Sequence, residues 1–122
     1  MPLRLDHVVL WVADPLRSVE FYERVVGLEG VRVDAFREGK APFPSVRISD
    51  DSIVDLMSLQ AAQLLNSLPG AAGSAGNRVN HLCLAMSQAE YTALRARLAD
   101  AGVETPVTMK QSFGAGGLAP EA

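Results

Sequence analysis

The feature that most limits the fold of this chain is a pattern that occurs twice along its 122 residues. In each copy a histidine opens an apolar run, a helix-start signal follows, and an amphipathic stretch ends at a glycine. His7 and Gly27 bound the first copy, and His81 and Gly102 bound the second at a nearly equal interval. These are the only two histidines in the sequence. Because each has the same place in its copy, a duplicated fold can bring the two imidazoles together in space.

The first copy predicts a strand followed by a helix. Residues 5–12 are apolar and rich in β-branched side chains, which is typical of a buried strand. Asp14 is a good N-cap, and Pro15 suits the first helical position, where no amide donor is needed. Apolar residues then recur at helical spacing up to Gly27, which can adopt the positive φ that ends a helix.

The second copy follows the same order. Residues 79–86 are predicted to form its strand, and Ser87 with Glu90 makes the Ser-x-x-Glu capping box of a helix start. An apolar stripe continues to Gly102, where the helix is expected to end.

Further strands are expected at residues 31–36, 44–49 and 53–59, with a turn at 50–52 between the last two and a short helical turn at 61–67. The glycine- and proline-containing stretch 68–77 is read as a linker. It divides one domain into module one (1–67) and module two (78–122).

Module two is expected to be incomplete. Residues 103–110 can form one strand, and the glycine-rich stretch 114–117 is read as a hairpin connection. Two strands that would match module one do not follow within the sequence.

Composition narrows the class of function. A chain of this length is expected to be a single domain, and its net charge of −3 offers no basic surface for nucleic acid. It contains neither an apolar run long enough to span a bilayer nor the hydrophobic core of a signal peptide. Cys83 is the single cysteine, so no internal disulfide is possible, and a cytoplasmic location is expected.

Alternation along the strands sorts the candidate site residues onto one face. His7, Val9 and Trp11 share a face of the first strand, and His81 shares a face with Cys83 in the second. The helices are expected to pack on the apolar parts of the opposite faces, which are Val8, Leu10 and Val12 in the first strand and Leu82, Leu84 and Met86 in the second. The histidine face is therefore predicted to line a pocket, although either histidine taken alone is better explained as a structural residue at a strand end.

Asp55 is the candidate third ligand. It lies within an apolar predicted strand, where an unpaired buried carboxylate would be costly, and a cation would compensate it. Two histidines and a carboxylate suit iron(II), manganese, nickel, cobalt or zinc. The alternative is an ion pair with an arginine such as Arg47 on the neighbouring strand.

Five segments together resemble the vicinal oxygen chelate superfamily, which includes glyoxalases, extradiol dioxygenases and bleomycin-resistance proteins. They are 5–14 (LDHVVLWVAD), 18–28 (SVEFYERVVGL), 53–57 (IVDLM), 80–84 (NHLCL) and 101–103 (AGV). The resemblance implies an α+β fold of paired βαβββ modules that form an open, curled mixed sheet. It also implies that His7, Asp55 and His81 are metal ligands. The family's last ligand follows an Asp-Pro-x-Gly-Asn hairpin that this sequence does not contain, and Glu121 is not assigned that role.

The resemblance implies two main functions. One is a divalent-metal-dependent lyase, isomerase or dioxygenase that acts on a small oxygen-chelating substrate; no catalytic base is assigned. The other is a metal-free protein of the bleomycin-resistance type that binds a small molecule against Val9, Trp11, Met57 and Cys83. A structural dimerisation module without ligand is a third reading, and a homodimer is expected in every case.

Overall fold

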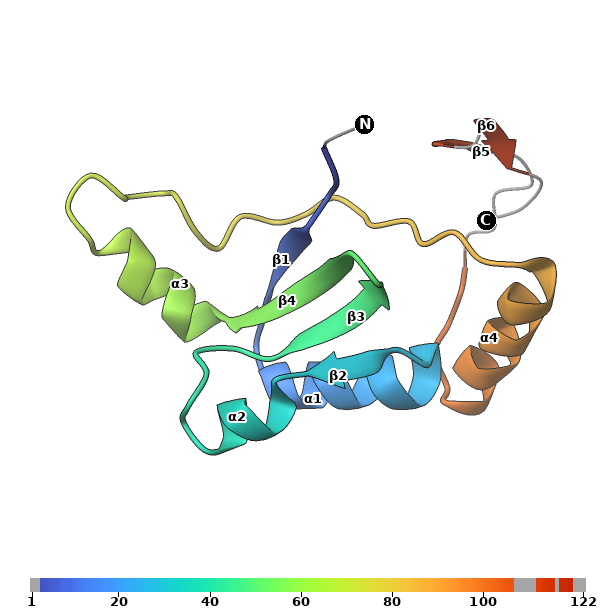
Figure 1. Ribbon diagram of the computed structural model, residues 1–122, viewed down its shortest axis with the longest axis horizontal. Helices are drawn as coiled ribbons and strands as arrows, with labels where there is room; N and C mark the ends of the chain where they lie inside the picture. Colours follow the sequence, from blue (N-terminus) through green and yellow to red (C-terminus); the bar gives the residue numbers. More distant parts are fainter. Residues whose placement is uncertain (1–2, 107–111, 116, 120–122) are drawn as a thin grey trace.

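The computed structural model describes residues 3–106, 112–115 and 117–119. Its centre is a mixed four-stranded open sheet in the order β1-β4-β3-β2 (Figure 1). β1 runs parallel to β4, and the other neighbouring pairs are antiparallel. The strands are β1 (His7–Val12), β2 (Glu29–Val31), β3 (Ser45–Ser49) and β4 (Ser52–Ser58). The architecture confirms the predicted α+β fold class.

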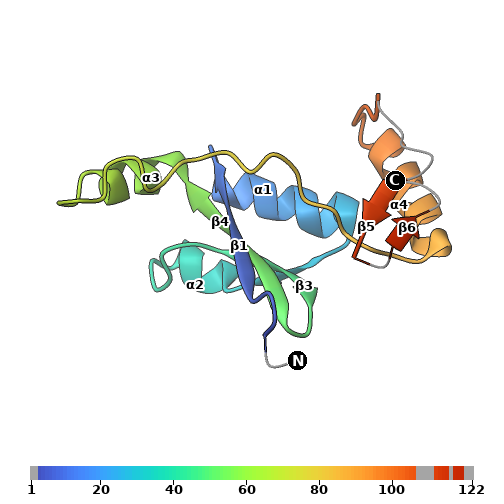
Figure 2. The ribbon, with the colours of Figure 1, turned by 90° about the horizontal axis from the view of Figure 1, so that it is seen from above.

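The helices lie around this sheet, and a separate two-stranded hairpin stands apart from it (Figure 1). Helix α3 is at one end of the molecule, whereas α4 and the hairpin β5-β6 are at the other (Figure 2). These elements are α1 (Pro15–Phe21), a π-helical turn η1 (Tyr22–Val26), α2 (Val33–Arg37), α3 (Leu59–Asn66), α4 (Gln88–Asp100), β5 (Ser112–Gly114) and β6 (Gly117–Ala119). None of the helices in the described residues is long and apolar enough to cross a membrane.

Local signals explain both long helical segments. The Asp14 side chain accepts a hydrogen bond from the Arg17 amide at 3.3 Å, and Gly27 ends the segment at φ 86°. At the start of α4, Ser87 and Glu90 form the predicted capping box. Both helix predictions are confirmed; the π-helical turn at the end of the first is the added detail.

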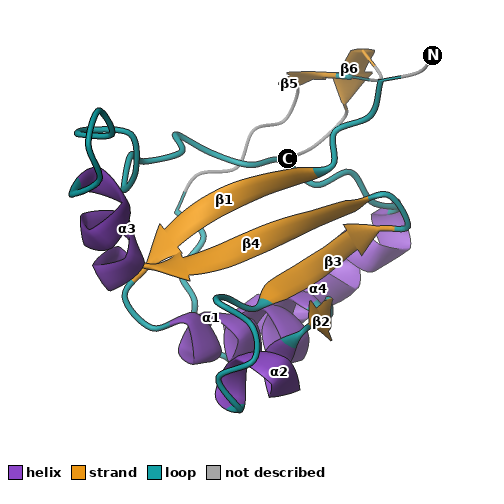
Figure 3. Cartoon of the chain, turned by 60° about the vertical axis from the view of Figure 1, so that its left-hand side comes forward, coloured by secondary structure: helices purple, strands orange, loops and turns teal. Residues whose placement is uncertain are grey.

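The core lies between the sheet and α1. Val19 of α1 packs with Val46, Val54 and Leu56 of the sheet, and Leu10 and Val12 of β1 border this cluster. In Figure 3 the helices α1 and α4 are seen below and behind β3. By strand alternation, His7 and Asp55 occupy the face turned away from the core, and for His7 this is the predicted face.

The strand predicted at 31–36 is wrong. β2 ends at Val31, and Arg32 adopts a left-handed backbone conformation with φ 57° and ψ 25°. This turn breaks the extended run and starts α2, which an ion pair of 3.1 Å between Asp34 and Arg37 supports. The hairpin β3-β4, the helical turn after it and the turns of 68–77 agree with the sequence-based expectations.

The strand predicted at 79–86 is also wrong. These residues are irregular and mostly exposed. β1 is a strand because β4 pairs with it along its length, from His7 opposite Ile53 to Val12 opposite Ser58. In the described residues of the second half, β5 and β6 pair with each other, and neither pairs with 79–86. Of the strand predicted at 103–110, residues 103–106 are irregular and the others lie outside the described residues.

An arginine side chain joins α4 to the first half. Arg97 Nε donates to the carbonyl of Val25 at 2.7 Å, and its Nη2 donates to that of Val26 at 3.3 Å. These carbonyls lie at the end of the π-helical turn, where a helix leaves its acceptors without intrahelical partners. Helix α4 itself contains no fully buried residue.

Candidate functional site

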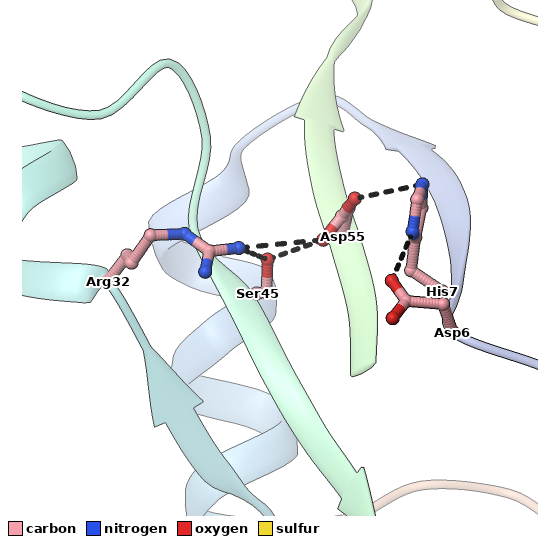
Figure 4. A network of polar contacts seen from close by, with 5 residues as sticks. All are labelled: Asp6, His7, Arg32, Ser45 and Asp55. Carbon is pink, nitrogen blue, oxygen red and sulfur yellow. Dashed lines mark hydrogen bonds and ion pairs between the residues drawn. The ribbon is translucent and has the colours of Figure 1, made fainter. Parts of the chain in front are cut away.

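The parallel pairing of β1 with β4 brings two of the predicted ligands together. Its register places Val9 opposite Asp55, and His7 lies two residues before Val9, on the same face of the sheet. His7 Nε2 lies 3.9 Å from Asp55 Oδ2 (Figure 4). A histidine and a carboxylate from different strands thus face each other outside the core.

A neighbouring carboxylate orients the His7 ring. His7 Nδ1 lies 2.8 Å from Asp6 Oδ2, and 51% of its side chain is exposed. This hydrogen bond is the main reason why the pKa of His7 rises above its usual 6.5; the negative charge of Asp55 adds to the increase, and desolvation opposes it. When Nδ1 donates to Asp6, Nε2 is left toward Asp55, an arrangement common for histidines that bind metals.

Asp55 is buried and already has polar partners. Only 6% of its side chain is exposed. The Ser45 hydroxyl, opposite it on β3, donates to Oδ1 at 2.6 Å, and Arg32 Nη2 lies 3.9 Å from the same oxygen. Arg32 Nη2 also donates to Ser45 Oγ at 3.0 Å (Figure 4). The two carboxylate oxygens are therefore divided, with Oδ1 toward Arg32 and Ser45 and Oδ2 toward His7.

The expected alternative, an arginine partner for Asp55, is present, but the arginine is Arg32. Arg47 instead donates to the carbonyls of Ser49 and Asp50, each at 3.4 Å. Sequence reasoning missed both Arg32 and Ser45. Arg32 belongs to a segment that was expected to be a strand, and it reaches the site because the chain turns there.

His81, the third predicted ligand, does not join this pair. It lies on the irregular segment 79–86, is exposed, and its Nδ1 lies 2.6 Å from Asn80 Oδ1. The described residues contain no group of three or more histidine, cysteine, aspartate or glutamate side chains that could hold a metal ion. The three-ligand set is therefore not assembled within the described part of one chain.

His7 and Asp55 nevertheless suit a divalent ion in part. Two ligand atoms bound at about 2.1 Å to one ion lie roughly 3 Å apart, so the 3.9 Å gap requires only a small closure. Among the described residues, the polar neighbour of Asp55 Oδ2 is His7 Nε2, so Oδ2 is the oxygen left for such an ion. The pair supplies two ligands, and the remaining positions need other donors.

Three of the four residues predicted to line a pocket lie on one sheet face, and the fourth does not. By strand alternation, Val9, Trp11 and Met57 lie on the same face as His7 and Asp55, and all three are half-buried. Cys83 is exposed on the irregular segment, so the sheet does not position it. A separate open hollow of about 540 Å³ lies along α1 and is lined mainly by charged side chains, among them Arg17, Glu20 and Arg37. It does not include the His7–Asp55 pair.

The fold, together with a histidine and a carboxylate on one sheet face, is typical of a known class of proteins. Residues 4–116 match the family model of the Glyoxalase/Bleomycin resistance protein/Dioxygenase superfamily, and the chain belongs to this superfamily. Membership indicates a metal-dependent enzyme or a binding protein of the glyoxalase type. The superfamily commonly binds a divalent metal and small molecules and often forms dimers.

Solved structures share the fold at low sequence identity. The virulence protein STM3117 from Salmonella typhimurium is 20% identical, with a TM-score of 0.58 over 97% of this chain and 83% of that one. Oxidase ChaP-H2 is 19% identical, with a TM-score of 0.58 over 84% of this chain and 65% of that one. The chain thus spans less than two thirds of the oxidase. A search of curated proteins finds no match.

Proposed function

We propose that this chain is a divalent-metal-dependent enzyme of the glyoxalase or dioxygenase type that acts on a small oxygen-chelating substrate. The observation that carries the proposal is the approach of His7 Nε2 to Asp55 Oδ2, with Asp6 holding the imidazole in place. Membership in a superfamily that commonly binds divalent metals supports it. His7, Asp55 and His81 are the proposed ligands.

His81 would have to reach the pair by a rearrangement of 79–86 or from a second chain. A homodimer, which we also propose, allows the second route. Nothing in the described residues of one chain holds His81 in a packed position, since its side chain is exposed. A cytoplasmic location remains a prediction.

The chain's own residues have distinct parts in this proposal. Asp6 fixes the His7 ring, and burial in β4 fixes Asp55. Val9, Trp11 and Met57 present apolar surface that would exclude water from a bound substrate. A bound divalent ion would supply Lewis acidity toward adjacent substrate oxygens.

Metal binding tests the proposal. Protein freed of metal with EDTA is titrated with Mn²⁺, Fe²⁺, Co²⁺, Ni²⁺ and Zn²⁺ by calorimetry, and elemental analysis gives the metal content per chain. We expect saturable binding that His7→Ala, Asp55→Asn and His81→Ala each weaken strongly. Asp51→Asn, which removes an exposed carboxylate in the β3-β4 turn, is the matched control and should bind as wild type does. Absence of stoichiometric binding by the wild-type chain would refute the proposal.

A second candidate is a metal-free protein that binds a small molecule, and the contacts of Asp55 favour it. Ser45 and Arg32 already provide this buried carboxylate with a hydrogen bond and a positive charge. Val9, Trp11, Met57 and Cys83 are the proposed wall. Trp11 is the single tryptophan, so quenching of its fluorescence by aromatic compounds in EDTA tests this function. Unchanged fluorescence across a panel of such compounds would count against it.

A further inference from the structure

We propose that Arg32 is an internal counter-cation for Asp55 and that it limits the affinity of this site for divalent metal. The inference rests on the proposed metal function and assigns that site a residue which restrains it. Arg32 Nη2 lies 3.9 Å from Asp55 Oδ1, and the Ser45 hydroxyl bridges the two groups.

The backbone places Arg32 in this role. Arg32 is the N-cap residue of α2, yet its side chain makes no capping hydrogen bond and reaches toward the sheet instead. Among the described residues it is the only non-glycine residue at positive φ. Residues other than glycine adopt this left-handed backbone conformation at an energetic cost, which the surrounding contacts must offset. The hydrogen bond to Ser45 and the attraction to Asp55 are such contacts.

The two partners differ greatly in exposure. The Arg32 side chain is 46% exposed, whereas that of Asp55 is only 6% exposed. The carboxylate is therefore fixed in the sheet, while the guanidinium can move outward into solvent. At 3.9 Å the guanidinium neutralises Asp55 without a close bidentate contact, so it leaves Oδ2 open toward His7.

A divalent ion and the Arg32 guanidinium would compete for the negative charge of Asp55. A divalent ion between His7 and Asp55 Oδ2 would lie on the other side of the same carboxylate from Arg32. Two cations that share one carboxylate repel each other, and each weakens the attraction that the other feels. Removal of the guanidinium should therefore tighten metal binding, and retention of a positive charge at this position should not.

Four variants separate charge from backbone effects. Arg32→Met removes the charge at similar length, and Arg32→Lys keeps it. Arg32→Gly removes the charge and also suits the positive φ, so it guards against a variant that fails to fold. Arg47→Met is the matched control, because Arg47 lies on the same sheet face but, within the described residues, directs its hydrogen bonds to the carbonyls of Ser49 and Asp50.

Calorimetric titration with Ni²⁺ and Mn²⁺ gives the readout. We expect Arg32→Met and Arg32→Gly to bind at least about tenfold more tightly than wild type, and Arg32→Lys and Arg47→Met to stay within about threefold. Equal affinity of all five proteins would overturn the role of Arg32 and leave the metal function standing.

The remaining outcomes distinguish the two proposals. Binding by Arg32→Met and Arg32→Gly but not by wild type would support Arg32 as the limiting residue and contradict a metal-dependent function for the natural chain. No binding by any of the five proteins would overturn both. Tighter binding by Arg47→Met to the same degree would also overturn the inference, because the effect would then reflect general surface charge.

Discussion

Residues 7–12 and residues 79–86 occupy equivalent places in the two halves of the chain, and they end in different states. The first segment is β1, paired along its length with β4 and bordering a core that contains Leu56. The second is irregular and mostly exposed. Strand formation in this molecule therefore follows the presence of a neighbouring strand, because backbone groups outside a ladder gain nothing from an extended conformation.

The largest expected effect comes from truncating a leucine in each half. Leu56 is 0% exposed and Leu82 is 42% exposed. Leu56→Ala should destabilise the protein by about 2–5 kcal/mol, since it leaves a cavity in the core. Leu82→Ala should change stability by no more than about 0.5 kcal/mol. Urea denaturation of both variants measures the difference, and similar losses would mean that residues 79–86 are covered in solution.

The helix caps give a second, smaller contrast. Asp14→Ala should cost about 0.5–2 kcal/mol of global stability, because it removes the cap of α1, whose Val19 is part of the core. Ser87→Ala removes the capping box at the start of α4, a helix that has no buried residue. It should weaken α4 locally, seen by circular dichroism, with little change in the urea midpoint. A shift of that midpoint as large as that of Asp14→Ala would show that the two helices unfold together.

The subtlest contrast concerns the neighbours of the two histidines. His7 lies beside the charged Asp6, whereas His81 lies beside the neutral Asn80. The raised pKa of His7 means that its contribution to stability is complete below pH 6.5 and is lost as pH rises through the folded-state value. NMR titration should show the His7 pKa above 6.5 and falling toward it in Asp6→Asn. A value at or below 6.5 in the wild-type chain would contradict the arrangement at the site.

Local signals made part of the fold predictable. The caps at Asp14 and Ser87 act within a few residues of themselves, so the helices that follow them could be found from sequence. The strand at 79–86 could not be judged in this way, because its formation depends on a partner far along the chain. The turn at Arg32 was missed because no glycine or asparagine marks its positive φ.

Sequence reasoning found two of the five residues in the polar network of Figure 4, His7 and Asp55. Alternation placed His7 on the face away from the helices, since parity is set within each strand, but only the pairing of β1 with β4 shows that Asp55 shares this face. Ser45 needed the register of the hairpin, and counting back from the pair Ser49 and Ser52 gives the wrong neighbour. An irregularity between Arg47 and Ser49 shifts the register by one residue and brings Ser45 opposite Asp55.

The contact that Arg97 makes with the carbonyls of Val25 and Val26 has a consequence for how the molecule opens. A helix held largely by surface contacts can detach while the sheet and α1 stay folded, because few buried apolar groups are exposed by the event. Amide hydrogens of α4 should then exchange with solvent through this partial opening, long before those of β4. The folded state of α4 would thus have a shorter lifetime than that of the sheet. The contact of Arg97 with the two carbonyls would set the rate at which α4 detaches.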